Sequence, residues 1–394
     1  MITVSEAKLL IRQHIPAPEI ISKPLQSAAD YVLAEDVKAI TDIPAFAQSS
    51  MDGYAVKFED IEKGLIIKTT IQAGSTANTW VNNGEAARIF TGAPLPTGAD
   101  TVIMQEKVEV KNGILYCRDP DLQIYNNVRA KGSEIQKDDL AVQKGSLLTP
   151  AATGFLAGIG IAAVRVYEKP KIALIITGDE LQQPGQELQA GQVYDSNSYA
   201  LNAALKKEGF NDIQTYFVSD NPHQLKETLK ESLQTHTLIL LTGGVSVGDY
   251  DFVVASAQEN SIDTIFHKVK QKPGKPLFFG KKENALIFGL PGNPASVLTC
   301  YYQYVLPAIR LMYGLDLPLK TIRAVLTHDI TKENALTQFY KAHIEEGKVT
   351  PLTAQESYRM STFATSNCFI RLGENPCNYH AGDTVDVDLL PDSI

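Results

Sequence analysis

The sequence predicts a multidomain protein of α/β plus β class, with a doubly wound α/β domain as its central part. Apolar runs alternate with helix-length segments from Lys171 to about Gly314, a pattern typical of βαβ units and a mainly parallel sheet. Short β-like runs separated by Gly, Pro and Asn turns fill residues 46–142 and indicate an inserted β-rich domain. Comparable runs after Pro318 indicate a C-terminal β-barrel domain.

Residues 1–45 and 143–168 are predicted to form one discontinuous, α-rich N-terminal domain around this insertion. We expect one helix from Val4 to His14 and a second helix around Ser27–Val32. The segment PAATGFLAGIGIAAV is expected to form a helix that packs with these two. The weakly charged stretch around it holds only about fourteen convincingly apolar residues, and a membrane-spanning helix needs roughly twenty.

The α/β domain is predicted to span residues 169–316, and the C-terminal β-barrel residues 317–394. The expected α/β strands are KIALIIT, IQTYFVS, TLILLTG and NALIFGL, and the expected helices are Ser198–Glu208, His223–Gln234, Tyr250–Glu259 and Pro294–Met312. The second helix has a clear start signal, because Asn221 is a good N-cap residue and Pro222 suits a first helical turn. The expected barrel strands are IRAVLTHDI, QFYKAHIEE, NCFIRL and DTVDVDLL.

The composition narrows the class of protein. The 394 residues include 36 Lys and Arg against 45 Asp and Glu, and the net charge of −9 excludes a globally basic nucleic-acid binder. Four cysteines without a CxxC pair support neither a disulfide framework nor a cysteine-rich zinc site, and they fit a reducing cytosol. The histidines lack HxxxH or HxH spacing, which argues against a zinc hydrolase. The N-terminal residues lack the apolar core of a secretory signal, so we expect a soluble, cytoplasmic protein.

Unusual loops follow each of the four expected parallel strands. In chain order they contain Gly178–Leu181, Asp220, Gly243–Asp251 and Pro291–Pro294. Ligands of open α/β sheets bind beyond the carboxyl ends of the strands. We therefore expect these loops to converge on a ligand site.

The glycine-rich loop is similar to a phosphate-binding loop but does not match one. Gly243 and Gly248 have the spacing of a P-loop, whereas Asp249 and Tyr250 stand where Lys and Ser or Thr are required. Glycines there still let backbone N–H groups approach an anion at the start of the next helix. Asp251 repels phosphate directly and could hold it only through a bridging Mg²⁺. The alternative is a tight strand-to-helix turn that binds nothing.

Four lysines lie close together in FHKVKQKPGKPLFFG. If this run is extended, Lys268, Lys270 and Lys272 lie on one face. The Pro-Gly-Lys-Pro turn places Lys275 in a rigid loop. We interpret the run as a local anion-binding patch. The alternative is a solvated edge strand, because lysine also blocks the edges of sheets.

Two more loops, in the β-rich part, have suggestive compositions. Residues 44–55 contain Asp52 beside Gly53, and residues 91–100 form a rigid Pro/Gly loop that begins with Thr91. By composition alone, either loop could be an ordinary turn.

Seven motifs, taken in order, resemble those of the molybdopterin molybdenumtransferase family, called MoeA in bacteria and the E domain of gephyrin in animals. The motifs are SSMDGYAV, TGAPLPTGADTVIMQE, ITGDEL, YDSN, TGGVSVGDYD, KPGKP and GLPGNPAS. The resemblance extends over most of the chain. The resemblance implies the four-part subunit expected above, with the α/β domain binding molybdopterin. It also implies an elongated homodimer whose active cleft lies between the α/β domain of one subunit and the inserted β domain of the other.

The reaction implied by the resemblance is insertion of molybdate into adenylylated molybdopterin, with release of AMP and assistance by Mg²⁺. The catalytic residues it implies are Asp52, Glu180, Asp220, Asp251, Lys268 and Lys272. The substrate-binding residues it implies are Thr91, Gly92, Glu134, Gly243, Gly244, Ser246, Gly248, Lys275, Pro291, Gly292, Asn293, Pro294, Lys341 and Ser357. Glu180 and Asp251 would also hold the Mg²⁺. Backbone amides and lysines would neutralise the anionic substrates.

The sequence departs from the family pattern at two of these positions. Ser133-Glu134 stands where the family often has Glu-Asp, so the carboxylate is one methylene further from the backbone. Lys341 stands where some relatives carry arginine, which keeps the charge but loses the bidentate fork.

Two other functions remain open at this point: the related molybdopterin adenylyltransferase step, and a gephyrin-like scaffold. A molybdopterin adenylyltransferase and molybdoenzyme-maturation proteins are the expected partners. Neither nucleic acid nor a membrane is expected as a partner.

Overall fold

The computed structural model describes residues 1–76, 78–244 and 252–391, and the chain divides into two compact units. Unit 1 contains residues 1–21, 30–32 and 167–394, and unit 2 contains residues 22–29 and 33–166. The predicted α/β and barrel structures both belong to unit 1, and the inserted β-rich structure belongs to unit 2. The boundaries of the four-part division stay a prediction. Among the described residues, no helix combines the length and apolar character needed to cross a bilayer.

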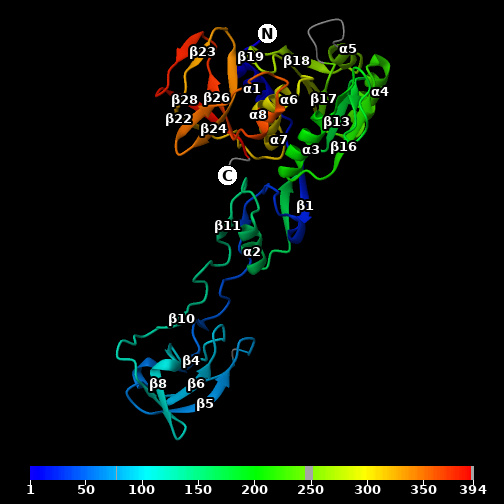
Figure 1. Cartoon of the computed structure of the whole chain (residues 1–394). Helices are drawn as coiled ribbons and strands as arrows, with labels where there is room; N and C mark the ends of the chain where they lie inside the picture. The colour runs from blue at the N-terminus through cyan, green and yellow to red at the C-terminus, as the bar shows by residue number, and fades with distance from the viewer. Residues whose placement is uncertain (77, 245–251, 392–394) are drawn as a thin grey trace. The chain divides into compact units, whose positions relative to one another are not determined.

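A six-stranded sheet is the centre of unit 1, in the strand order β16-β13-β17-β21-β20-β18 (Figure 1). The strands are β13 (Ile172–Thr177), β16 (Ile213–Val218), β17 (Leu238–Thr242), β18 (Asp263–Lys268), β20 (Pro276–Lys282) and β21 (Ala285–Leu290). The first four in this order run parallel, β20 runs antiparallel to them, and β18 at the edge pairs antiparallel with β20 and so points the same way as the first four. The predicted, mainly parallel sheet is confirmed, although β18 and β20 have no counterparts among the expected strands.

Helices cover both faces of this sheet. The helices α3 (Asn197–Lys207) and α6 (Pro294–Cys300) pack on one face, and α4 (Pro222–Thr235) and α5 (Phe252–Glu259) pack on the other. Side chains of a strand alternate between faces. Accordingly, Leu174 of β13 joins the core cluster that contains Leu201 of α3, whereas its neighbour Ile175 joins the cluster of Leu229 of α4. The doubly wound arrangement is therefore confirmed.

The helical stretch predicted at Pro294–Met312 contains a π-helical segment. It consists of α6, the π segment η4 (Tyr301–Val305) and α7 (Leu306–Met312). The N–H of Leu306 donates to the carbonyl of Tyr301, five residues earlier. Pro307 has no N–H and cannot bond back to the carbonyl of Gln303, which is consistent with a wider turn here. Tyr301 and Tyr304 are both buried in the core of unit 1.

The N-terminal helix is confirmed as α1 (Val4–His14), and its packing with the PAATGF helix stays a prediction. A capping box begins α1, because the Thr3 hydroxyl accepts from the N–H of Glu6 and the Glu6 carboxylate accepts from the N–H of Thr3. Its apolar face, which includes Ile11, joins the core of unit 1. The PAATGF helix, α2 (Pro150–Gly158), lies in unit 2.

Two helical expectations near the N-terminal part are corrected. Residues 27–32 form no helix. Only the 3₁₀ turn η1 (Leu25–Ser27) forms, and Asp30 follows in a left-handed backbone conformation with φ of 63° that ends helical propagation. Helix α2 ends at Gly158, and the chain then forms β12 (Ala163–Tyr167), paired with β1 (Ile20–Pro24). The alternation of buried Val164 and Val166 with exposed neighbours is a strand pattern.

The C-terminal part of unit 1 is a closed barrel, as predicted. Its strands are β22 (Thr321–Leu326), β24 (Thr337–Glu345), β25 (Lys348–Pro351), β26 (Cys368–Leu372) and β28 (Thr384–Leu389). The pairing of β24 with β26 closes the sheet. The short strand β19 (Gln271–Lys272) adds to β24 in parallel and so joins the lysine run to the barrel. Smaller elements are β14 (Leu181–Gln182), β15 (Val193–Tyr194), β23 (Ile330–Lys332), β27 (Cys377–Tyr379) and α8 (Met360–Ala364).

Unit 2 is built on a six-stranded sheet in the order β7-β4-β6-β5-β9-β8. The strands are β4 (Gly53–Val56), β5 (Leu65–Ile71), β6 (Glu85–Ile89), β7 (Thr101–Met104), β8 (Val108–Lys111) and β9 (Ile114–Cys117). Two short antiparallel pairs complete it, β2 (Val37–Lys38) with β11 (Leu140–Val142) and β3 (Gln48–Ser49) with β10 (Val128–Arg129). Two 3₁₀ turns, η2 (Phe58–Asp60) and η3 (Gln105–Lys107), lie between strands. The predicted β-rich character is confirmed.

Candidate functional site

A cavity of about 660 Å³ lies at the carboxyl ends of the parallel strands of unit 1. The loops after β13, β16, β17 and β21 all contribute to its wall, so the expected convergence of the four loops is confirmed. The predicted residues that line it are Glu180, Asp220, Gly243, Gly244, Pro291, Gly292, Asn293 and Pro294. From β13 the chain adds β16 on one side and β17 on the other, and such reversals of strand order are where open α/β sheets bind ligands.

Both glycines after β17 have positive φ angles, and close backbone packing also requires glycine at Gly243. Gly243 has a φ of +84°, and a Cβ at that position would lie 2.3 Å from the carbonyl oxygen of Thr177. Gly244 also has a positive φ, of 62°. A side chain at Gly243 would therefore push the loop away from β13. Ser246, Gly248 and Asp251, which were predicted to continue this site, lie outside the described residues.

The Pro-Gly-Asn-Pro loop is held by hydrogen bonds from two sides. The Asn293 side-chain amide donates to the hydroxyl of Ser357 at 2.8 Å, and the N–H of Ala295 donates to the carbonyl of Ser357 at 3.0 Å. On the other side, the Asn197 amide donates to the carbonyl of Gly292 at 2.9 Å. Ser357 and Asn293 are thus brought together as predicted binding residues, and Asn197 is a cavity residue absent from the predicted set.

Asn197 could have been found from the YDSN motif. In that motif Asp195 accepts from the N–H and the hydroxyl of Ser198 at the start of α3, and this turn places Asn197 against the cavity. Tyr194 and Tyr358 line the same cavity and were also absent from the predicted set. Tyr358 follows Ser357 directly, and the residue is 60% exposed.

Two predicted acidic residues, Glu180 and Asp220, share the cavity wall. The neighbouring carboxylate of Asp179 accepts the N–H of Asp220 at 3.1 Å and so links the loops after β13 and β16. In the part of the chain that the structure describes, no group of three or more His, Cys, Asp or Glu side chains is arranged to hold a metal ion. Any metal in this cavity would therefore need ligands from the substrate, from water or from outside the described residues.

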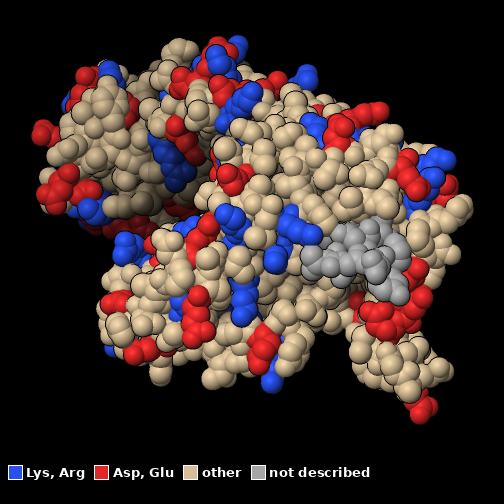
Figure 2. Space-filling model, turned by 90° about the horizontal axis from the view of Figure 1, so that it is seen from above, with Lys and Arg blue, Asp and Glu red and all other residues tan. Residues whose placement is uncertain are grey.

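The lysines of the 268–275 run do not line this cavity, although Pro276 next to Lys275 does. Val269 and Gln271 are fully buried, so Lys268, Lys270 and Lys272 alternate outward as predicted. Figure 2 views the side of the molecule where β18 and β19 are labelled in Figure 1, and it shows basic and acidic side chains mixed on that face.

Lys341 does not present its ammonium group to solvent. The residue is 2% exposed, and its Nζ donates to the carbonyls of Ala354 and Arg359, both at 3.0 Å. Burial lowers the pKa of Lys341. The structure places Lys341 beneath the loop that carries Ser357, where its ammonium group fixes the loop backbone.

Unit 2 brings together the predicted residues Asp52 and Thr91. One carboxylate oxygen of Asp52 accepts both the N–H and the hydroxyl of Thr91, each at 2.8 Å. These bonds, with the backbone donor first, lower the pKa of Asp52. Gly92 follows with a φ of +81° and donates its N–H to the carbonyl of Ser49. Glu134 is exposed on a separate loop of the same unit.

The sequence matches three family descriptions along its length. These are the MoeA N-terminal region (domain I and II) over residues 2–160, the probable molybdopterin binding domain over residues 173–311, and the MoeA C-terminal region (domain IV) over residues 323–390.

Curated relatives and solved structures agree with these matches. The molybdopterin molybdenumtransferase of Haemophilus influenzae is 34% identical over 98% of both chains, and that of Staphylococcus aureus is 32% identical over 98% of this chain and 95% of its own. Two crystal structures of the molybdopterin biosynthesis MoeA protein from Pyrococcus horikoshii superpose with TM-scores of 0.85 and 0.81, at 30% and 29% identity, over 99% of this chain and 99–100% of theirs. The chain therefore belongs to the molybdopterin molybdenumtransferase (MoeA) family.

Proposed function

We propose that this protein is a transferase of molybdenum cofactor biosynthesis that inserts molybdate into adenylylated molybdopterin and releases AMP. The observation that carries this proposal is one cavity in which backbone-exposing glycines, two carboxylates and the Pro-Gly-Asn-Pro loop meet at the carboxyl edge of the sheet. The names of the full-length relatives support the reaction class. The cavity volume of about 660 Å³ lies within the roughly 300–1,000 Å³ that small-molecule sites usually have.

The chemistry of the cavity suits a substrate with a phosphoanhydride. Release of AMP breaks a P–O bond of that anhydride and leaves negative charge on the departing phosphate. Backbone N–H groups near Gly243 and Gly244 can stabilise this charge without reorganising. Glu180 and Asp220 can accept hydrogen bonds from a water that approaches the anhydride, and so hold it in place.

A magnesium ion is part of this proposal. Mg²⁺ usually binds one or two carboxylates together with waters and substrate phosphates, and Glu180 and Asp220 fit that donor set. When bound, the ion would neutralise charge on the phosphate oxygens. Glu180 was predicted as a ligand together with Asp251, which lies outside the described residues.

We further propose a cytoplasmic homodimer in which a second copy completes the site. Asp52, Thr91 and Glu134 belong to unit 2, and Gly243 and Gly244 belong to unit 1. In this proposal, unit 2 of one copy contributes these residues to the site in unit 1 of the other copy. A molybdopterin adenylyltransferase would supply the substrate, and molybdoenzyme-maturation proteins would take the product.

The test is release of AMP by the purified protein from adenylylated molybdopterin with molybdate and Mg²⁺. We expect release that depends on molybdate and stops on chelation of Mg²⁺. A parallel reaction with molybdopterin and ATP tests the adenylyltransferase alternative, and an adenylylated product there would replace the proposal. Tungstate in place of molybdate tests the choice of metal, because the two oxyanions have similar size and charge.

A further inference from the structure

The turn Lys272–Pro276 carries two of the predicted anion-binding lysines, Lys272 and Lys275, and it is closed by a buried side chain. Gln271 has no exposed surface. Its Nε2 donates to the carbonyl of Gly274 at 2.8 Å, and its Oε1 accepts the hydroxyl of Tyr304. One side-chain amide therefore closes the turn and ties it to η4, the π-helical segment.

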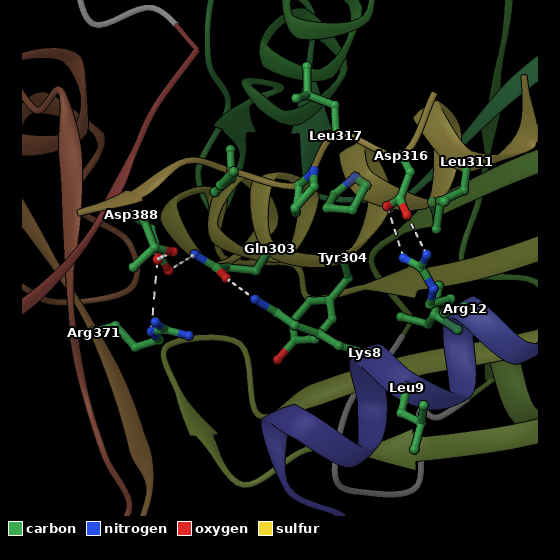
Figure 3. Close-up of a pocket in the computed structure, with 16 residues that line it drawn as sticks. Lys8, Leu9, Arg12, Gln303, Tyr304, Leu311, Asp316, Leu317, Arg371 and Asp388 are labelled. Carbon is green, nitrogen blue, oxygen red and sulfur yellow. Dashed lines mark hydrogen bonds and ion pairs between the residues drawn. The ribbon is translucent and has the colours of Figure 1, made fainter. Parts of the chain in front are cut away.

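Tyr304 is itself fixed on its other side. Its ring lines a second cavity of about 360 Å³, with the ammonium group of Lys8 at 5.9 Å from the ring centroid. Lys8 donates to the Gln303 side-chain carbonyl at 2.6 Å, and the Gln303 amide donates to the carboxylate of Asp388 at 3.0 Å. Figure 3 shows this series of residues, which joins α1 and the barrel to the segment that holds Tyr304.

Close packing leaves the turn little freedom to shift. Gly274 has a φ of +84°, and a Cβ there would lie 2.6 Å from the sulfur of Cys300 and 2.9 Å from the Nε2 of Gln271. The N–H of Val269 donates to the carbonyl of Lys275 at 3.0 Å across the base of the turn. The turn therefore rests directly on α6, while the side chains of Lys272 and Lys275 are exposed.

We propose that Gln271 and Tyr304 are positioning residues that fix Lys272 and Lys275 for binding of the anionic substrate. This inference rests on the proposed function, because it takes these lysines, which adjoin the cavity at Pro276 and do not line it, as cations that meet a part of the substrate extending beyond the cavity. Lysine side chains are long and flexible, so the backbone beneath them is what the fold can hold in place. A cation that is held before the substrate arrives binds an anion without the cost of reorganising.

The first test compares two tyrosines of η4. Tyr304→Phe removes the hydroxyl that bonds Gln271, whereas Tyr301→Phe removes a hydroxyl that is buried in the same segment and has no hydrogen-bond partner within the described residues. We expect hydrogen exchange of residues 268–276 to become faster in Tyr304→Phe and to stay unchanged in Tyr301→Phe. Equal exchange in both variants would overturn the inference, whatever the activity of the protein.

The second test is a double-mutant cycle on AMP release. Tyr304→Phe is expected to raise the KM for adenylylated molybdopterin about fivefold with less than a twofold change in kcat, because it alters binding of the ground state and the transition state alike. Lys272→Ala is expected to raise the same KM. If Tyr304 acts through the turn, Tyr304→Phe raises KM by a smaller factor in the Lys272→Ala protein than in the wild-type protein.

The outcomes separate this inference from the proposed function. If Lys272→Ala and Lys275→Ala raise KM and Tyr304→Phe behaves like Tyr301→Phe, the positioning role is wrong and the proposed function stands. If neither lysine variant changes KM, the lysines do not bind the anionic substrate, and the inference is wrong as well. Gln271→Met, which keeps the length of the side chain and loses both hydrogen bonds, must reproduce the effect of Tyr304→Phe. A wild-type KM in a folded Gln271→Met protein would also overturn the inference.

Discussion

Asp52 accepts two hydrogen bonds from a single residue, Thr91, through its N–H and its hydroxyl, each at 2.8 Å. These two residues lie thirty-nine positions apart, one beside β4 and the other after β6. The hydrogen bonds from Thr91 lower the pKa of the Asp52 carboxyl on the surface of unit 2. They therefore keep this carboxylate ionised and fix its orientation. A carboxylate held in this way is suited to contact a metal ion or a donor of the substrate.

We expect Thr91→Val to raise the pKa of Asp52 toward its ordinary value, because the hydroxyl donor is lost and the N–H donor remains. A carbon-detected NMR titration of the Asp52 carboxyl measures this. The lowered pKa also determines how the contribution of this pair to the stability of the protein changes with pH. The contribution of the pair is present above the unfolded-state pKa and is lost as the pH falls through the folded-state value. An unchanged midpoint in Thr91→Val would show that the hydroxyl does not stabilise the carboxylate.

Gly243→Ala is expected to lower the free energy of unfolding of unit 1 by at least about 2 kcal/mol, because alanine is strained at positive φ and its Cβ would collide with the Thr177 carbonyl. Urea unfolding followed by far-UV circular dichroism measures it, since the single tryptophan, Trp80, lies in unit 2. Gly292→Ala is the matched control. Gly292 lines the same cavity, and a Cβ there meets nothing within 4 Å. A loss of stability in the control equal to that in Gly243→Ala would contradict the steric explanation.

Much of the α/β framework could be predicted because its signals are local. Asn221 accepts the N–H groups of His223 and Gln224, and Pro222 begins α4, as the start signal indicated. The alternation of outward lysines with buried Val269 and Gln271 also follows from strand geometry. Helix starts and strand alternation are determined by residues that are close together in the chain, so both can be predicted from the sequence.

The features that could not be predicted depend on distant partners. Lys341 was expected to bind substrate, and only the fold shows that its ammonium group lies among the carbonyls of residues 354–359. Nothing in the lysine run singles out Gln271, because its hydrogen-bond partner Tyr304 lies thirty-three residues later in the chain. A helix was expected around Ser27–Val32, whereas Asp30 has a left-handed backbone conformation that a helix does not contain.

Tyr358 is expected to contact a flat ring of the substrate. The residue is 60% exposed and lies at the wall of the 660 Å³ cavity, and its neighbour Ser357 is hydrogen-bonded to the Pro-Gly-Asn-Pro loop. Stacking of a heterocyclic ring on an aromatic side chain contributes about 1–3 kcal/mol, so Tyr358→Leu should raise the KM for adenylylated molybdopterin about tenfold. Tyr358→Phe keeps the ring and should stay close to wild type in the same assay.

Tyr199→Leu is the matched control for that experiment. Tyr199 is similarly exposed, at 54%, and is not among the residues that line the cavity. We expect its KM to equal that of the wild type. If Tyr358→Leu and Tyr199→Leu behave alike, the ring of Tyr358 does not meet the substrate.

Lys8 is expected to titrate far below an ordinary lysine. Burial lowers its pKa from 10.5 to about 8, and the nearby Asp388 partly opposes the shift by favouring the ammonium form. Because the unfolded chain keeps the proton up to its higher pKa, it binds more protons than the folded chain between these values, and stability should rise with pH across that window. Heteronuclear NMR of the lysine Nζ measures the midpoint directly. Asp388→Asn should lower it further, because the opposing charge is removed, and a wild-type midpoint near 10.5 would mean that this ammonium group is solvated.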